Sequence, residues 1–345
     1  MAAVDSTNSS SRAPSQSSSI VSSASQNRSR GRAPRYAAAS RLPVLLEFTS
    51  ATTCRAGYAG DAQPRRQVIL PSPQSSSSVL VDTNFHHADT ARLMRDAFQR
   101  LGQDPAERNV IVLVPPVAGL TFIQPNAVLQ RVLWDMGVPA LTIMPSILHA
   151  ATAMPVETGI LVHMEAAETH CVVYACDTVL PFTYQVVPTT TNTAEVGVDP
   201  SDIDATVEAL LQCLQACPLQ VRKQAVSNLF FSGQVCNQQP TIGRRVARRL
   251  RDVLLRQESA TSNEQLNPAS AVSATHGAVL TSTPVALKNL QCLAGSVGVI
   301  QTPCSPDLIT WVGTSLWAAH WHGQASLEDN KGGYNAVLEW TRRPG

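Results

Sequence analysis

From Pro43 onward, hydrophobic and polar residues follow two kinds of pattern. Short apolar or β-branched runs predict three successive strands joined by small-residue turns: PVLLEF (43–48), TTCRAGYAG (52–60) and RQVIL (66–70). The segment ADTARLMRDAFQRL (88–101) instead has apolar residues three and four apart, with Asp89 near its start and Gly102 after its end, and predicts a helix. The opening pattern is therefore three strands followed by a helix.

The next segments continue as strands and helices in alternation. NVIVLVPP (109–116) and VPALTIMP (138–145) are continuous apolar runs typical of strands buried on both faces, and QPNAVLQRVLWDMG (124–137) predicts a helix with Pro125 in its first turn. We therefore expect an α/β domain.

The second half repeats this order. TGILVHM (158–164), AETHCVVYAC (167–176) and VLPFTYQVV (179–187) predict three strands, and PSDIDATVEALLQCLQACP (200–218) predicts a helix. A strand (NLFFSG, 228–233) and a helix (TIGRRVARRLRDVLLRQ, 241–257) follow, and DLITWVGTSLWAAHWHG (307–323) reads as a strand running into a Trp-rich helix. Two halves with one pattern suggest an internal duplication.

Three segments of the chain have a biased composition and no periodic pattern of hydrophobic residues. Residues 1–40 are rich in Ser with scattered Arg and almost no large apolar side chains, which predicts a disordered arm. A QSSSS bridge (74–78) and a Ser/Thr/Asn/Ala-rich stretch (257–284) are expected as a flexible connection and a surface insertion. The expected organisation is therefore an arm (1–40), a first α/β half (41–157) and a second half (158–345).

Charge and cysteine content narrow the class of protein. The net charge of +1 gives no electrostatic reason to favour nucleic acid or an anionic membrane. The eight cysteines form no Cys-x-x-Cys pair, so we expect buried free thiols in a reducing compartment and no metal site. No apolar run is long enough to span a bilayer, and a cytosolic or nuclear protein is expected.

One string carries a family resemblance. RAGYAGDAQPR (55–65) resembles the N-terminal signature of actins and actin-related proteins, which follows their first phosphate loop. TGILVHMEAAETH (158–170) lies where their second phosphate loop belongs, and WVGTSL (311–316) is similar to their C-terminal Trp motif with Thr314 in place of Gly. ACPLQVRKQAVSNLFFSG (216–233) is most similar to the branch at the pointed end of dynactin, the actin-related protein 10 type.

The resemblance implies an actin-like fold of two α/β domains, each built on a duplicated ribonuclease-H-like unit, with truncated outer subdomains. It also implies a cleft between the domains that holds ATP and a divalent cation in the family. That site needs glycine amides near the phosphates and carboxylates around the cation.

Most of these cleft positions carry other residues here. In the first loop, Phe48 stands at the acid with Glu47 beside it, Ser50 and Thr52 replace glycines, and Arg55 replaces a lysine. The second loop has His163 and Ala166 at its acids and Glu165 and Ala167 at its glycines, and Ser146 replaces the water-orienting Gln. Thr169, His170, Ser232 and Gly233 remain, and Gln234 follows where a second Gly is expected.

These replacements predict a degenerate ATPase cleft and no enzyme. Losing three or four charge-assisted contacts weakens binding by roughly 5–10 kcal/mol, or about four to seven decades in affinity. Glu165 adds repulsion towards a triphosphate. We therefore expect no cofactor, with weak ATP binding left open.

The resemblance also predicts which surfaces are present. In actins, the two outer subdomains form the pointed-end face. Only residues 71–87 stand where the first would be, and about a dozen residues stand where the second would be. The barbed-end face is expected to persist, with a partner surface at Ser146, Leu148, Met154, Trp317 and Trp321, where Trp317 and Trp321 are either interface or core.

A subunit with only the barbed-end face can end a filament, because head-to-tail assembly needs both patches. The resemblance thus implies a non-catalytic dynactin subunit that caps the pointed end and supports dynein-driven transport on microtubules. Its partners would be the filament-forming actin-related protein, the other pointed-end subunits and indirectly dynein, in the cytoplasm and cytoskeleton, without nucleic acid or direct membrane contact. The alternative is a nuclear actin-related subunit of a chromatin-remodelling complex.

The run RRVARRLR (244–251) is read as the solvated face of an amphipathic helix.

Overall fold

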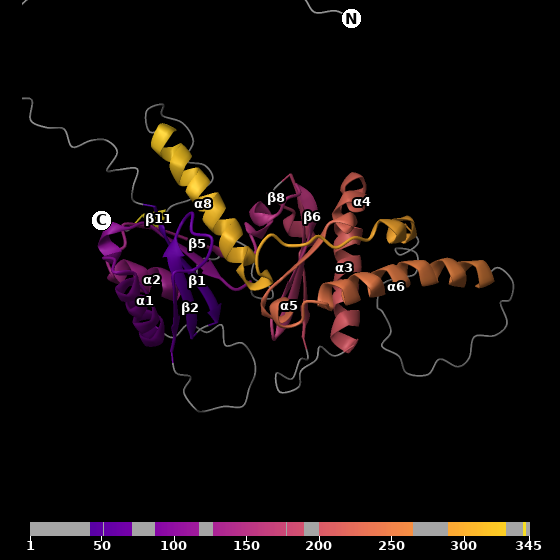
Figure 1. Ribbon diagram of the computed structural model, residues 1–345, viewed down its shortest axis with the longest axis horizontal. Coiled ribbons are helices and arrows are strands. Elements are labelled where there is room, and N and C mark those ends of the chain that lie inside the picture. Colours follow the sequence, from indigo (N-terminus) through magenta and orange to yellow (C-terminus); the bar gives the residue numbers. More distant parts are fainter. Residues whose placement is uncertain are drawn as a thin grey trace, which may run out of the picture. The chain divides into compact units, whose positions relative to one another are not determined.

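The described part of the chain is a mixed α/β structure with two sheets (Figure 1). The computed structural model describes residues 42–50, 52–70, 87–116, 127–176, 178–189, 200–264, 289–328 and 341–342. All of these fall in one compact unit that spans residues 39–345. The α/β expectation is therefore confirmed.

Within the described residues, the first sheet has six strands in the order β11-β5-β4-β1-β2-β3. Its strands are β1 (Val44–Ser50), β2 (Thr53–Tyr58), β3 (Arg66–Ile69), β4 (Val110–Val114), β5 (Ala140–Pro145) and β11 (Thr341–Arg342). β1, β2 and β3 form an antiparallel meander, whereas β4 and β5 continue the sheet in parallel with β1. β11 pairs antiparallel with β5, so the end of the chain returns to this sheet.

The second sheet repeats much of that order, with β10 beside β6 and β6 beside β7. Its strands are β6 (Thr158–Met164), β7 (Glu168–Ala175), β8 (Thr178–Val179), β9 (Gln185–Pro188) and β10 (Leu229–Ser232). The strand predicted at 179–187 is interrupted by a 3₁₀ turn, η4 (Pro181–Thr183), because Pro181 has no N–H to donate to a ladder. β8 and β9 both pair with β7, and β10 runs parallel to β6.

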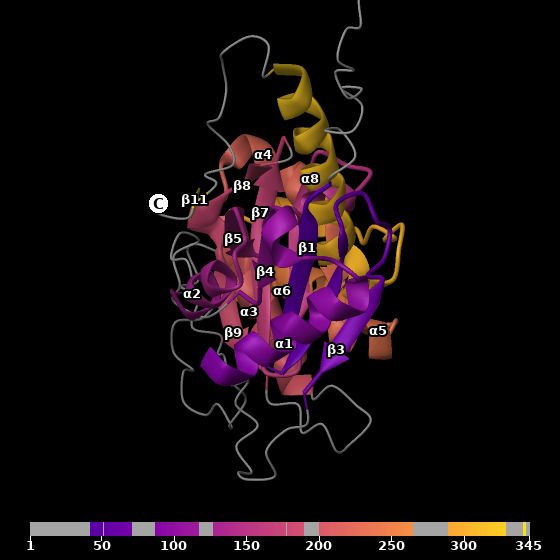
Figure 2. The same ribbon diagram turned by 90° about the vertical axis from the view of Figure 1, so that its left-hand side faces the viewer.

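Helices cover both sheets. They are α1 (His87–Leu101), α2 (Ala127–Asp135), α3 (Pro200–Ala216), α4 (Leu219–Ser227), α5 (Gln234–Gln238), α6 (Ile242–Glu264) and α8 (Ile309–Glu328). Short 3₁₀ turns lie at η2 (Pro105–Glu107), η3 (Ala150–Ala153), η5 (Gln291–Ser296) and η6 (Pro306–Leu308). Figure 2 shows α1 and α2 in front of the first sheet, where their apolar faces meet β1 and β4.

Side chains alternate between the two faces of each sheet. In β1, Val44, Leu46 and Phe48 pack in the core under α1 and α2, whereas Leu45 packs with α8 on the opposite face. In β6, Ile160 and Val162 pack in the core with α3 and α6, whereas Leu161 packs with η3 on the other face. The faces of β1 and β6 that carry Leu45 and Leu161 are therefore covered by α8 and η3.

The strand predicted at the start of segment 307–323 is wrong. Residues 306–308 form η6, and α8 begins at Ile309. The run Ile-Thr-Trp-Val is β-branched and aromatic, which is typical of strands, but tertiary packing overrides this preference. Trp311 is fully buried, as expected, but it is buried as part of a helix.

Residues 57–61 hold α8 against the first sheet. The backbone oxygen of Asp61 accepts hydrogen bonds from Trp311 Nε1 at 3.1 Å and from Ser315 Oγ at 2.8 Å. The Asp61 carboxylate accepts the backbone N–H of Tyr58 at 2.8 Å and thereby fixes the turn. A Cβ on Gly57 would lie 2.9 Å from the Trp311 ring, so this position needs glycine for close approach.

Several expected segments lie outside the described residues. These are the arm 1–40, the bridge 74–78, Pro125 and the insertion from residue 265 onward; residues 257–264 belong to α6. The expected boundary at 157/158 falls between β5 and β6. α8 packs on the first sheet and β11 pairs within it, although both were expected in the 158–345 half.

Exposure settles two other expectations. The arginines of α6 lie on its exposed side and Ile242, Val246, Leu250 and Val253 are buried, as predicted. Five of the eight cysteines are buried free thiols, but Cys176 and Cys292 are exposed and Cys304 is partly exposed. No helix among the described residues is long and apolar enough to cross a bilayer.

Replacing Gly57 by Ala tests the seating of α8. We expect the Gly57→Ala variant to lose about 1–3 kcal/mol of unfolding free energy, because the added methyl group meets the rigid Trp311 ring. Gly295→Ala is the control, since a Cβ there meets nothing within 4 Å. Equal urea-unfolding free energies for the two variants would contradict this account.

Candidate functional site

A pocket of about 390 Å³ lies at the carboxyl ends of parallel strands from both sheets. Its lining includes the end of β1, the residues that directly follow β4 (Pro115), β5 (Ser146) and β6 (Glu165), and the second residue after β10 (Gln234). Open α/β sheets bind ligands at such strand ends. The pocket is therefore the candidate site, and several residues that the sequence analysis assigned to a cleft lie in its lining.

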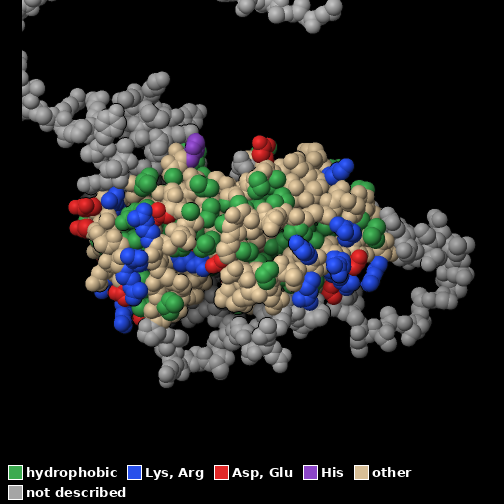
Figure 3. Space-filling view, viewed as in Figure 1, with side chains coloured by type: hydrophobic (Ala, Val, Ile, Leu, Met, Phe, Trp, Pro, Cys, Tyr) green, Lys and Arg blue, Asp and Glu red, His purple; other side chains and the backbone are tan. Residues whose placement is uncertain are grey.

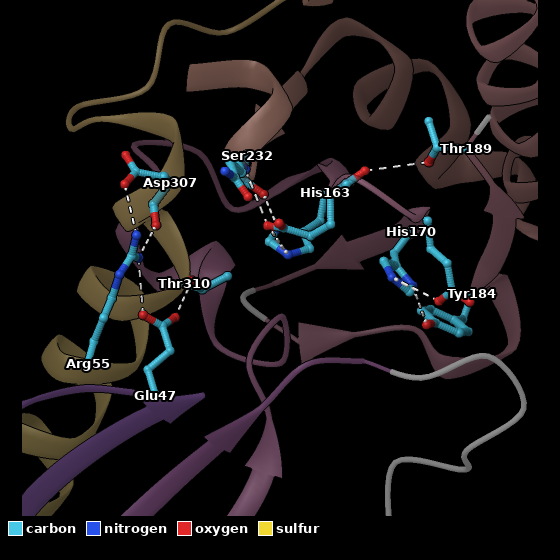
Figure 4. A network of polar contacts seen from close by, with 12 residues as sticks. Glu47, Arg55, His163, His170, Tyr184, Thr189, Ser232, Asp307 and Thr310 are labelled. Atoms are coloured by element: carbon cyan, nitrogen blue, oxygen red, sulfur yellow. Dashed lines mark hydrogen bonds and ion pairs between the residues drawn. The ribbon is translucent and has the colours of Figure 1, made fainter. Parts of the chain in front are cut away.

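A buried carboxylate on β1 anchors one wall. Glu47 is 2% exposed, and its Oε1 accepts a hydrogen bond of 2.6 Å from Thr310 Oγ1 at the start of α8. Its Oε2 lies 3.4 Å from Arg55 Nη1 on β2. Arg55 also donates from Nη1 to the Asp307 backbone oxygen at 2.7 Å and from Nη2 to Asp307 Oδ2 at 3.0 Å (Figure 4). One guanidinium thus joins β1, β2 and η6.

Burial and hydrogen bonding have opposite effects on the pKa of Glu47. Burial raises the pKa of Glu47 above its ordinary value, while the neighbouring Arg55 and the Thr310 hydroxyl act in the opposite direction. A buried carboxylate without a cation is strongly destabilising. Arg55 is thus the group that allows Glu47 to be charged inside the fold.

The opposite wall holds a neutral histidine. His163, at the end of β6, has its Nδ1 2.9 Å from Ser232 Oγ on β10 and its Nε2 3.3 Å from Glu165 Oε1. Desolvation lowers the pKa of His163 to about 4 and raises that of Glu165 to about 7. With the proton on Nε2, His163 donates to Glu165 and accepts the Ser232 hydroxyl at Nδ1.

Behind this wall lies a second buried histidine. His170 on β7 stands opposite His163 in the sheet register, and its Nδ1 is 2.7 Å from the Tyr184 hydroxyl. Burial, with a smaller effect of His163, lowers the pKa of His170 to about 3. His170 is 3% exposed, so it is a packed residue of the sheet.

The structure brings some of the predicted residues together and separates others. Those that line the pocket are Phe48, Ser50, Arg55, Ser146, His163, Glu165 and Gln234. Those outside its lining are Thr52, Ala166, Thr169, His170, Ser232 and Gly233. Phe48 is 1% exposed in the core under α1, whereas Glu47 lies on the opposite face of β1 towards Thr310. The carboxylate that β1 presents towards α8 is therefore that of Glu47, one position before Phe48.

Gly233 has a backbone role. Its φ of +98° lies in the region that favours glycine, and a Cβ would meet the Met164 backbone oxygen at 2.3 Å. This residue lets the chain leave β10 against the end of β6.

Sequence reasoning missed the third wall. Asp307, Thr310 and Asn237 all line the pocket, and the Ser305 hydroxyl lies within hydrogen-bond distance of both the Asn237 side-chain amide and the Asp307 carboxylate. The available signal was the polar pair Asp307 and Thr310 just before a hydrophobic run. The strand interpretation of that segment hid it, because the helical turn from η6 into α8 brings the two residues, three apart in the chain, to the same pocket.

These residues do not fit a magnesium-bound triphosphate. The titratable lining contains three carboxylates (Glu47, Glu165 and Asp307), one arginine and the neutral His163. Arg55 is already bound to two of the carboxylates, and Glu47 uses both of its oxygens. No group of three or more His, Cys, Asp or Glu within the described ranges is arranged to hold a metal ion.

The predicted partner surface is mostly packed. Ser146, Met154 and Trp317 are 5%, 8% and 9% exposed, and Leu148 and Trp321 are partly buried. Trp317 stacks on His149 with ring centroids 3.8 Å apart. The exposed apolar side chain beside them is Leu316 on α8, at 48%, which sequence reasoning did not single out.

Comparison with known proteins assigns no family. No family model matches the chain, and no curated protein matches it.

Removing the guanidinium tests the Glu47 network. We expect Arg55→Met to lose about 3–5 kcal/mol of unfolding free energy near neutral pH, because Glu47 is left buried without a cation. The loss shrinks as pH falls, since the raised pKa of Glu47 lets the carboxyl take up a proton. Arg65→Met is the control, because Arg65 is 56% exposed in its ion pair with Asp61, and such pairs contribute about 0.2–1 kcal/mol. Equal losses for both variants in urea unfolding would refute this role of Arg55.

The His163 ring provides a pH test. Its lowered pKa means that the folded state binds fewer protons than the unfolded chain between about pH 6.5 and 4. The contribution of the neutral His163 ring to the unfolding free energy is complete above about pH 6.5. It is lost progressively as pH falls to about 4. An NMR titration, with the signal assigned by its loss in His163→Gln, should find the ring neutral at about pH 5.5. A midpoint near 6.5 would contradict the geometry.

Proposed function

We propose that this chain is a non-catalytic subunit of the actin-related type that caps the pointed end of the actin-like filament in dynactin. In this role it supports dynein-driven transport along microtubules. It works by docking, and its cleft holds the two halves of the chain together without nucleotide.

One observation carries this proposal. The pocket at the strand ends is lined by the protein's own ion pairs, with Arg55 bound between Glu47 and Asp307. In a nucleotide-binding cleft, a ligand and its cation supply these charges. Here a side chain supplies the positive charge, so the segments around the cleft are joined permanently.

The arrangement of strands supports the actin-like part of the proposal. In both sheets a strand leads into an antiparallel neighbour and is flanked on its other side by a later parallel strand: β4 beside β1 and β10 beside β6. A repeated topology of this kind is compatible with a duplicated ribonuclease-H-like unit. The string 55–65 supports the same family.

Chain length supports the capping part. β3 ends at Ile69 and α1 begins at His87, while β9 ends at Pro188 and α3 begins at Pro200. In the actin-like interpretation, these are the places of the two outer subdomains, and neither interval is long enough for one. The face that would receive a following subunit is therefore reduced.

The docking face that remains centres on α8 and η3. The two elements pack against each other, and Leu316 leaves α8 with 48% of its surface exposed. An exposed Leu beside the packed Trp317 suits an interface with the last subunit of a filament. Leu316 is therefore the residue that we assign to this contact.

Affinity purification of the tagged chain from cells tests the proposal. We expect the filament-forming actin-related protein, the other pointed-end subunits and dynein to co-purify, and Leu316→Asp to lose them. Leu219→Asp on α4 is the matched control, since Leu219 is 74% exposed, and it should retain these partners. Recovery of chromatin-remodelling ATPases in place of dynactin chains would overturn the proposal in favour of the nuclear alternative.

A further inference from the structure

The exposed side of α6 carries a concentrated positive charge. Between residues 244 and 256 the helix has six arginines and one acid, Asp252: Arg244, Arg245, Arg248, Arg249, Arg251 and Arg256. Figure 3 shows Lys and Arg side chains gathered over this helix. We call these six side chains the α6 arginine face. The cluster is notable because the net charge of the whole chain is only +1.

The face is held on a rigid support. Ile242, Val246 and Leu250, on the opposite side of α6, are 1% exposed or less in the core of the second sheet. α3 packs beside α6, so the arginines are fixed relative to the first turns of α3. The buried side of α6 belongs to a different core cluster from α8, whose buried side chains pack with the first sheet and, at Ile309, with β6, β7 and β10.

A groove runs between the two helices. It has a volume of about 320 Å³ and is lined by Ile203, Asp204, Arg245, Arg248, Arg249 and Asp252. Ile203 is 7% exposed, so the groove has an apolar residue at its side and charged residues around it.

One arginine of this groove already binds a carboxylate. Arg249 donates from Nε to Asp204 Oδ1 at 2.6 Å and from Nη2 to Asp204 Oδ2 at 3.2 Å. This is a two-bond contact of a guanidinium with a carboxylate, which is the strong form of the interaction. The Arg249–Asp204 contact shows how a carboxylate of an acidic partner would bind another arginine of this face.

Within the described part of the chain, the neighbouring arginines have no such partner. Arg244, Arg245 and Arg248 are exposed and form no ion pair with any residue whose position is described. Exposed like charges on one helix side repel one another. A set of carboxylates brought by another molecule removes that repulsion.

We propose that the α6 arginine face is a docking surface for an acidic segment of another protein. Carboxylates of that segment bind Arg245 and Arg248 along the groove, beside the contact that Arg249 makes with Asp204. An apolar side chain of the segment packs near Ile203 and the exposed Leu255.

The lining of the groove favours a protein over a continuous polyanion. Asp204 and Asp252 place two carboxylates among the arginines, and they would repel a phosphate backbone or a charged membrane surface that covers the whole face. A protein segment can place its acids only opposite the arginines. The exposed Leu255, at 44%, also offers an apolar contact that a nucleic acid backbone would not use.

Fluorescence anisotropy on the full chain tests this surface. The probe is a short fluorescein-labelled peptide of repeating Glu-Asp-Leu-Gly units. We expect saturable binding that weakens with added salt, and we expect Arg245→Glu/Arg248→Glu to weaken it by about tenfold or more. Arg245→Gln/Arg248→Gln removes the charges without reversing them and should weaken binding in the same direction.

The control variant has the same change in net charge, placed on a different helix. Arg92→Glu/Arg95→Glu alters two exposed arginines on α1 and should leave the peptide affinity within about twofold. Equal losses for both double reversals would overturn the proposal, because the binding would then follow net charge alone. Tighter binding of a DNA duplex or of phosphatidylserine vesicles through Arg245 and Arg248 would also overturn it, in favour of a phosphate-binding surface.

Discussion

The structure depends on how one buried carboxylate is neutralised. Glu47 lies at the end of β1, where strand alternation turns it away from the core under α1 and towards α8. Arg55 and Thr310 supply the hydrogen bonds that a buried carboxylate needs, and Arg55 also binds Asp307. Asp307 lies 252 residues after Arg55, and Thr310 lies 263 residues after Glu47, so this network ties the beginning of the fold to a segment near its end.

The same constraint is the reason why we expect this pocket to bind nucleotide poorly. Both terminal nitrogens of Arg55 already donate to Glu47 or Asp307, and the other charged groups of the lining are carboxylates. His163 is neutral at physiological pH and so adds no positive charge. A polyphosphate would have to break the Arg55 contacts and leave Glu47 uncompensated. The two proposed docking surfaces, on α8 and on α6, lie on elements that this network or the second core holds in place.

Much of the fold could be predicted from the sequence because its signals are local. The continuous apolar runs of β4, β5 and β6 and the helical spacing of α1 and α6 each identify an element without knowledge of the rest. The site was only partly predictable. Ser146, His163 and Glu165 were found at the pocket. The alternation of side chains along β1 decides whether Glu47 or Phe48 points towards α8, and one shift in register exchanges the two faces. Asp307 and Thr310 were missed because their partners are distant in sequence and because the β-branched run after them favours a strand. The pairing of His163 with Ser232 likewise depends on the parallel contact of β6 and β10.

Calorimetric titration of the folded chain with magnesium-ATP tests the central claim most directly. If the Arg55 contacts occupy the cleft, the titration will show no saturable heat at millimolar ligand, because binding would require those contacts to break. A magnesium-dependent complex with a Kd below about 10 µM, corresponding to more than about 6.8 kcal/mol of binding free energy, would contradict the account.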